Sequence, residues 1–144
     1  EEFLFWLTPE LARLALIKGC WGIGPKTADS VILSTFKATH FIPCDVHLMT
    51  VAERLGLVEE GGTEMPRKSF CSRYVCEENI SKLWKIERCP LAKRNLCLRS
   101  KLAYLKKTGG WVQTLAYLHG IRYCSPRSPR CGECRIRDLC SWRR

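Results

Sequence analysis

Four cysteines near the C-terminal end are spaced closely enough to bind a metal cofactor together. They fall as Cys124-x6-Cys131-x2-Cys134-x5-Cys140. Thiolates bind zinc or iron–sulfur clusters, and a [4Fe–4S] cluster takes one cysteine per iron. Zinc ribbons generally offer two C-x2-C pairs, whereas this span has one. The spacing therefore favours a [4Fe–4S] cluster.

A glycine-rich turn, "GIGPK" at residues 22–26, has the composition of an anion site. Gly22 and Gly24 allow positive φ and the close approach of another backbone, and Pro25 suits the first position of a helix. The amides of this turn would point outward together, as they do where a helix N-terminus binds a phosphate. An ordinary glycine turn between two helices is the alternative.

Lys26 follows this turn directly, in the first turn of the helix that Pro25 begins. The positive end of the helix dipole disfavours the ammonium form there, so we expect a lowered pKa. A neutral amine can attack a carbon centre and form a Schiff base. The alternative is a solvated lysine that contacts a phosphate.

Helices must position these residues. Thr8 and Pro9 predict a helix up to about Lys18, and Pro25 and Asp45 predict the starts of two more, with Asp45 as an N-cap. The apolar faces expected for the second and third are Ala28, Val31, Ile32 and Thr35, and Leu48, Val51, Ala52 and Leu55. Trp111, Leu115 and Leu118 mark a helix near the C-terminal end. The fold class is all-α.

The chain divides into three parts: residues 1–58, a connecting segment at 59–110 with no clear helical period, and residues 111–144. The 144 residues carry a net charge of +10, with five Lys/Arg against nine Asp/Glu up to residue 64 and nineteen against five afterwards. Such an asymmetry predicts a polyanionic partner, usually nucleic acid. No apolar run approaches a membrane span and no signal peptide is visible, so we expect a soluble, intracellular protein.

Two motifs resemble those of a known family. The run "GIGPKTADSVI" followed by "PCDVH" resembles the helix-hairpin-helix signature of the DNA glycosylase superfamily of endonuclease III, and "WVQTLAYLHGIRYC" with the cysteine spacing resembles its cluster loop. The resemblance implies that Lys26 attacks the sugar C1′ and that Asp45 assists departure of the base. The residues we expect to contact DNA are Gly22, Gly24, Pro25, Thr27, Arg122, Arg127, Arg130 and Arg135.

By this resemblance, the chain is the C-terminal portion of a two-lobed helical glycosylase. The implied function is base excision from double-stranded DNA, with lyase cleavage of the abasic site. The lesion is an oxidised pyrimidine or 8-oxoguanine, because "KTAD…PCDVHLMTVAER" also looks like the 8-oxoguanine DNA glycosylases. The helices that usually precede the hairpin would come from another segment or a second subunit. A non-enzymatic DNA-binding module is the alternative.

Four further cysteines lie in the connecting segment. Cys71, Cys76, Cys89 and Cys97 are separated by four, twelve and seven residues, without a C-x2-C pair. We therefore expect no second metal there, with disulfides as the alternative.

Overall fold

The computed structural model describes residues 8–142, and these residues contain helices and no β-strand. The all-α prediction is confirmed. The longer helices are α2 (Pro9–Gly19), α3 (Pro25–Phe36), α4 (Val46–Arg54) and α9 (Gly109–Arg122). The short ones are α5 (Lys68–Cys71), α6 (Glu78–Trp84), α7 (Pro90–Lys93), α8 (Leu98–Lys101) and the 3-10 turns η1 (Ala103–Thr108), η2 (Cys131–Glu133) and η3 (Arg137–Leu139).

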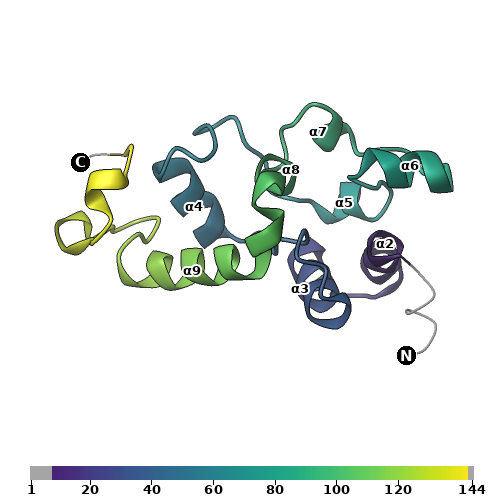
Figure 1. Ribbon diagram of the computed structural model, residues 1–144, viewed down its shortest axis with the longest axis horizontal. Helices are drawn as coiled ribbons and strands as arrows, with labels where there is room; N and C mark the ends of the chain where they lie inside the picture. Colours follow the sequence, from purple (N-terminus) through teal and green to yellow (C-terminus); the bar gives the residue numbers. More distant parts are fainter. Residues whose placement is uncertain (1–7, 143–144) are drawn as a thin grey trace.

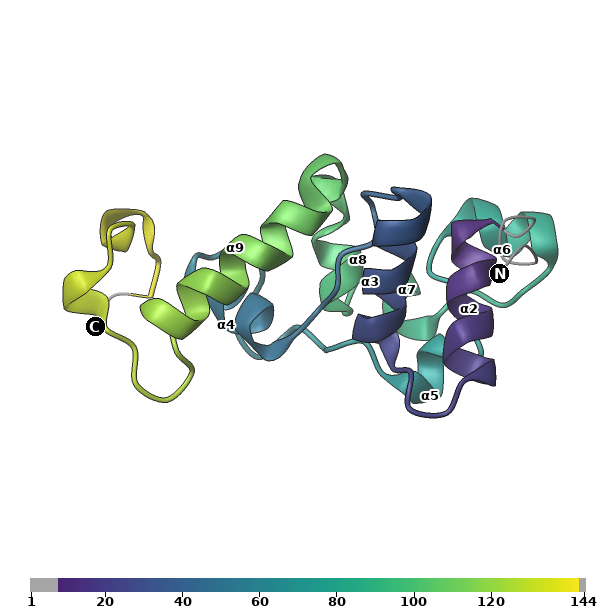
Figure 2. The same cartoon turned by 90° about the horizontal axis from the view of Figure 1, so that it is seen from below.

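The helices form an elongated arrangement (Figure 1). The C-terminal loop, residues 123–142, lies at one end, and α2 lies at the other with most of the connecting segment. Helices α4 and α9 lie side by side between them. Figure 2 shows α2 and α3 side by side, joined by the glycine turn. No helix of the described residues is both long and apolar enough to cross a membrane.

The expected helix starts are confirmed. The Thr8 side chain accepts a hydrogen bond from the Leu11 amide at 3.4 Å, and α2 begins at Pro9. Helix α3 begins at Pro25, and Asp45 caps α4 by accepting the Leu48 amide at 2.8 Å. Capping depends on residues a few positions apart, which is why the sequence predicts it well.

The expected apolar faces are only partly buried. Ala28 and Ile32 of α3 are buried, whereas Val31 is 37% exposed and Thr35 is also exposed. Helix α3 packs mainly on α2, so burial of a narrow stripe of positions four residues apart is enough to form this contact. In α4, Leu48, Val51 and Ala52 are buried as expected, with Leu55 half-buried at the C-cap.

Helix α9 packs on α4 through its small residues. Ala116 is buried, while Trp111 is 73% exposed and Leu115 and Leu118 are also exposed. A Cβ atom on Gly120 would lie 2.6 Å from Nδ1 of His47, so glycine is required for this close approach of the two helices. The main core joins this helix pair to Leu98 and Leu102 of the connecting segment.

A buried network of charges attaches the connecting segment to α2 and α3. Arg13 makes a two-pronged ion pair with Asp29, with Nη2 3.2 Å from Oδ2. Arg99 lies 3.8 Å from the same carboxylate and 2.9 Å from Glu77, and its guanidinium stacks over the Phe41 ring at 4.7 Å. The segment itself has helices of four to seven residues. These are too short to give a helical period in the sequence.

Candidate functional site

Lys26 and Asp45 lie together at the N-terminal ends of α3 and α4. The Lys26 Nζ atom is 3.1 Å from Oδ2 of Asp45. The Lys26 side chain is 52% exposed, whereas that of Asp45 is only 8% exposed. A reachable amine thus lies against a carboxylate that is almost withdrawn from solvent.

Two further donors hold the Asp45 carboxylate. The Leu48 amide donates to Oδ1, and Nε2 of Gln113 donates to Oδ2 at 3.0 Å. Burial raises the pKa of Asp45, but the bonds from Leu48, Lys26 and Gln113 outweigh burial and bring the pKa below its usual value. The carboxylate is therefore ionised at neutral pH.

The sequence analysis missed Gln113. Its spacing from Ala116 and Gly120 gives a signal that could have found it, because these three residues share the face of α9 that packs on α4. A polar residue on that face needs a partner from the facing helix.

The glycine turn before Lys26 is open to solvent. Gly22 has a φ of +82°, which favours glycine, and a Cβ atom at Gly22 or Gly24 would meet nothing within 4 Å. Thr27 is exposed, Pro25 is half-buried and the Trp21 side chain at the turn is 99% exposed. Another backbone could approach this turn without moving the protein.

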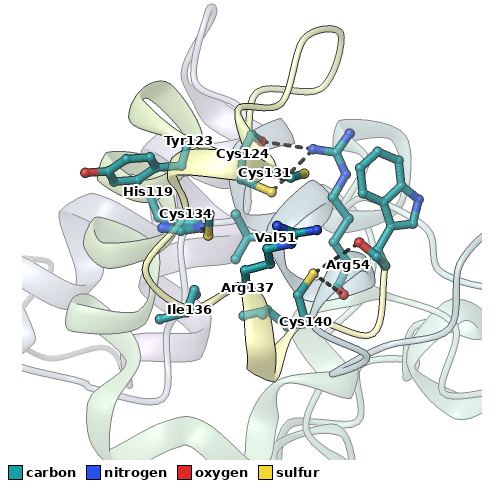
Figure 3. Close-up of a pocket in the computed structure, with 12 residues that line it drawn as sticks. Val51, Arg54, His119, Tyr123, Cys124, Cys131, Cys134, Ile136, Arg137 and Cys140 are labelled. Carbon is teal, nitrogen blue, oxygen red and sulfur yellow. Dashed lines mark hydrogen bonds between the residues drawn. The ribbon is translucent and has the colours of Figure 1, made fainter. Parts of the chain in front are cut away.

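The four cysteines of the C-terminal loop line a single pocket (Figure 3). They come from the end of α9 and from the two 3-10 turns, and each is half-buried. Val51 of α4, Leu55 at the C-cap of α4 and Ile136 form an apolar wall beside them. Four free thiols around one apolar-walled pocket fit a [4Fe–4S] cluster, which takes four cysteine ligands.

Arg54, which the sequence analysis also missed, anchors this loop to α4. Its buried guanidinium donates to the carbonyls of Ser125 at 2.9 Å and Pro126 at 3.0 Å, and lies 3.3 Å from both the carbonyl and the Sγ of Cys124. It also stacks over Trp142 at 4.1 Å. Within residues 8–142, no carboxylate forms an ion pair with Arg54.

Two other cysteines of the loop have polar neighbours. The Cys140 thiol donates to the Arg54 carbonyl at 3.2 Å, and the Cys134 sulfur lies 3.7 Å from Nε2 of His119. Burial lowers the pKa of His119, so the imidazole is neutral at neutral pH. The loop is thus held at both of its ends by α4.

All four arginines expected to contact DNA are exposed. Arg130 is partly occupied, because it lies 3.4 Å from Glu133 and donates to the Arg122 carbonyl at 2.9 Å. In the described part of the chain, Arg122, Arg127 and Arg135 form no ion pair. Their charges are available to a polyanion.

Comparison with known proteins agrees with this geometry. Residues 124–140 match the family model of the iron–sulfur binding domain of endonuclease III. The resemblance to the endonuclease III superfamily is confirmed. The match begins at Cys124 and ends at Cys140, and the cofactor that it indicates is the [4Fe–4S] cluster.

Two curated relatives cover most of the chain. It is 28% identical to the endonuclease III of Sulfolobus acidocaldarius over 125 residues, and 29% identical to that of Treponema pallidum over 119 residues. These matches cover 84% and 83% of this chain but 41% and 42% of the relatives. The chain therefore corresponds to less than half of each relative. No solved structure gives a significant match.

Proposed function

We propose that the chain is the catalytic portion of a base-excision DNA glycosylase that also cleaves the abasic site. The pairing of Lys26 with Asp45 carries this proposal, since an exposed amine and a nearly buried carboxylate are the two groups that such chemistry needs. The relatives are named endonuclease III, which supports the same class of activity.

In the proposed reaction, the Lys26 amine attacks C1′ of the damaged nucleotide. The bond from C1′ to the base breaks, and the base leaves with the electron pair and takes up the proton that Lys26 loses. Asp45 stays ionised because its pKa is below the usual value, so it stabilises the positive charge that develops on the sugar. It serves as an electrostatic group rather than as the final proton acceptor.

The covalent adduct then opens to a Schiff base between Lys26 and C1′. Water accepts the proton lost from C2′, the C3′–oxygen bond breaks with its electron pair on the departing phosphate, and hydrolysis of the imine by a second water returns the amine. Lys26 is thus nucleophile and electron sink in turn. The carboxylate of Asp45 lies close enough to Nζ to hold the iminium charge through these steps.

DNA would contact the protein at two places. The amides of the turn around Gly22 and Gly24 bind a phosphate near the lesion, and Arg122, Arg127 and Arg135 bind phosphates beside the C-terminal loop. The [4Fe–4S] cluster, held by the four cysteines of the loop, supplies a rigid support for those arginines.

We propose an oxidised pyrimidine or 8-oxoguanine as the lesion. Extrusion of a base needs a pocket that encloses it. The relatives are more than twice as long as the matched part, so the pocket would be completed by a further segment or by a partner chain.

Borohydride trapping on abasic DNA tests the proposal without requiring a complete base pocket. Lys26→Gln should abolish the trapped complex while DNA binding changes little, and Asp45→Asn should slow trapping without abolishing it. Lys37→Gln is the matched control, because Lys37 lies exposed at the opposite end of α3. Undiminished trapping by Lys26→Gln would leave Lys26 as a phosphate contact and favour a non-enzymatic DNA-binding module.

A further inference from the structure

Three of the four cysteines of the connecting segment share one small core. Cys89 and Cys97 are buried in it, and Cys76 packs against them. The Cys89 amide donates to the Val75 carbonyl at 2.8 Å and Nε of Arg88 donates to the Cys76 carbonyl at 3.1 Å. The two loop segments that carry Cys76 and Cys89 therefore lie side by side.

Cys71 is buried in a second core with Ile17 and Ala28, and it follows Phe70, which packs on the core of Cys89 and Cys97. The Cys71 sulfur lies 3.6 Å from Nη2 of Arg13, and Arg13 shares the Asp29 carboxylate with Arg99, two residues after Cys97. The buried ion-pair network therefore connects Cys71 to the segment that carries Cys97.

The core of Cys89 and Cys97 is small compared with the connecting segment that packs around it. Three of its eight residues are cysteines, and the helices around it have only four to seven residues. Lobes of this size usually need disulfides or a metal to be stable. All four cysteines are free thiols in the structure, so no disulfide supplies that support.

One buried hydrogen-bond donor beside these cysteines has no partner in the described residues. Arg13 Nη2 lies 3.6 Å from the Cys71 sulfur, and the buried Arg99 has an Nε without a hydrogen-bond partner. The two guanidinium groups share one fully buried carboxylate, Asp29, and the more exposed Glu77. A thiolate-bound iron–sulfur cluster would offer sulfur acceptors to this buried donor.

In the C-terminal loop, too, a guanidinium lies beside a cysteine sulfur. There a buried arginine, Arg54, lies 3.3 Å from the sulfur of Cys124 and forms no ion pair with any carboxylate of the described residues. Both cysteine sets therefore combine four thiols from loops and short helices with a guanidinium beside one sulfur. The spacing of the connecting segment alone disfavours a metal, but its packing supports one.

The spacing of the donor atoms argues against a single ion. In residues 8–142, the one group of three candidate ligands that all lie within 4.8 Å of one another is Glu10, His40 and Glu77. Those side chains already pair among themselves and with Arg99. Tetrahedral zinc, with Zn–S bonds of about 2.3 Å, would bring four sulfurs within about 4 Å of one another. In neither cysteine set do three sulfurs lie within 4.8 Å of one another.

We propose that Cys71, Cys76, Cys89 and Cys97 ligate a second [4Fe–4S] cluster. Its environment is more buried than that of the cluster in the C-terminal loop, and Arg13 and the Nε of Arg99 would donate to its sulfurs. The second cluster would hold the connecting segment against α2 and α3.

Iron and acid-labile sulfide in the chain, reconstituted and purified without oxygen, test this inference. We expect about eight of each per chain, falling to about four in Cys89→Ser and in Cys97→Ser. Cys20→Ser is the control, because Cys20 is exposed and belongs to neither set, and it should keep about eight.

A reciprocal variant guards against failure of Cys89→Ser to fold. Cys131→Ser combined with Cys134→Ser removes the loop cluster, and this variant should keep about four irons and the electron paramagnetic resonance signal of one reduced cluster. Iron lost completely from this variant, one zinc per chain, or disulfides among the four cysteines in the intact mass after alkylation would each overturn the proposal. None of these readouts depends on glycosylase activity.

Discussion

The C-terminal loop and the connecting segment are both rich in cysteine and in basic residues, but they differ in what their positive charges contact. In the loop and at the end of α9, Arg127, Arg135 and Arg122 are exposed and form no ion pair within the described residues. In the connecting segment, several basic side chains lie within 4.0 Å of a glutamate: Arg67 with Glu64, Lys82 with Glu78, Lys93 with Glu87 and Lys101 with Glu59.

The buried charges of the two regions differ in the same way. The connecting segment is attached through arginines that meet carboxylates, Asp29 and Glu77. The loop is attached through Arg54, which meets backbone carbonyls and a cysteine sulfur. Net charge therefore describes the chain incompletely, because part of the positive charge of the connecting segment is already paired with glutamates.

The largest effect should come from Arg13→Met. It leaves Asp29, which is fully buried, without its two-pronged partner, and breaking such a pair costs about 3–5 kcal/mol. Urea unfolding measures the loss. Arg73→Met is the control, since Arg73 is exposed, and it should change the unfolding free energy by less than about 0.5 kcal/mol. Equal effects of the two variants would contradict the structural role of the buried network.

Arg54→Met should cost less, about 2–3 kcal/mol, because it removes hydrogen bonds to neutral carbonyls rather than to a carboxylate. The loss should be local to the loop. We expect weaker absorbance from its cluster near about 400 nm while the helical circular dichroism is retained. Arg137→Met, in an exposed residue that lines the same pocket, should leave the absorbance unchanged. A global loss of helix in Arg54→Met would contradict this separation.

Gly120→Ala tests the contact between α9 and α4, the helix pair that lies between the C-terminal loop and the connecting segment. The added Cβ would lie 2.6 Å from His47, so one of the helices must move, at a cost of about 1–3 kcal/mol. Gly132→Ala places a methyl group in open space within the loop and should be neutral. Thermal unfolding of the two variants gives the comparison, and equal melting temperatures would show that the helices separate easily.

The smallest effect concerns DNA binding. Arg127→Gln with Arg135→Gln should lower the slope of log affinity against log salt by about 2, or about 1 for each phosphate contact. Lys82→Gln with Lys93→Gln removes the same charge from the connecting segment, where glutamates neutralise it, and should leave the slope almost unchanged. Equal slopes in both double variants would mean that DNA does not distinguish the two basic regions.

Local features of this fold could be predicted from the sequence. Thr8 and Asp45 cap their helices because a cap and its amide are three residues apart. The cysteine spacing indicated the cluster for the same reason, since Cys131 and Cys134 are close in the chain. The proximity of Lys26 and Asp45 was implied by family resemblance rather than by any local pattern.

Contacts between distant residues could not be predicted in this way. Asp29 reads as a polar position in α3, and nothing near it in the sequence shows that Arg13 and Arg99 meet it in the interior. Gln113 reaches Asp45 only because α9 packs on α4. In the same way, Val31 and Leu115 have the spacing of core residues, yet both are exposed because no described element covers that side of their helices.

Helix α4 carries Asp45 as its N-cap and Arg54 as its last residue, and it contains neither glycine nor proline between them. Asp45 belongs to the proposed active site and Arg54 holds the iron–sulfur loop, about 13 Å apart along one straight helix. An added or deleted residue in Val46–Arg54 would turn one end by about 100° relative to the other. Insertions and deletions should therefore be tolerated in the connecting segment but not in these nine residues. Their number sets the angle about the helix axis between Asp45 and the arginine that holds the iron–sulfur loop.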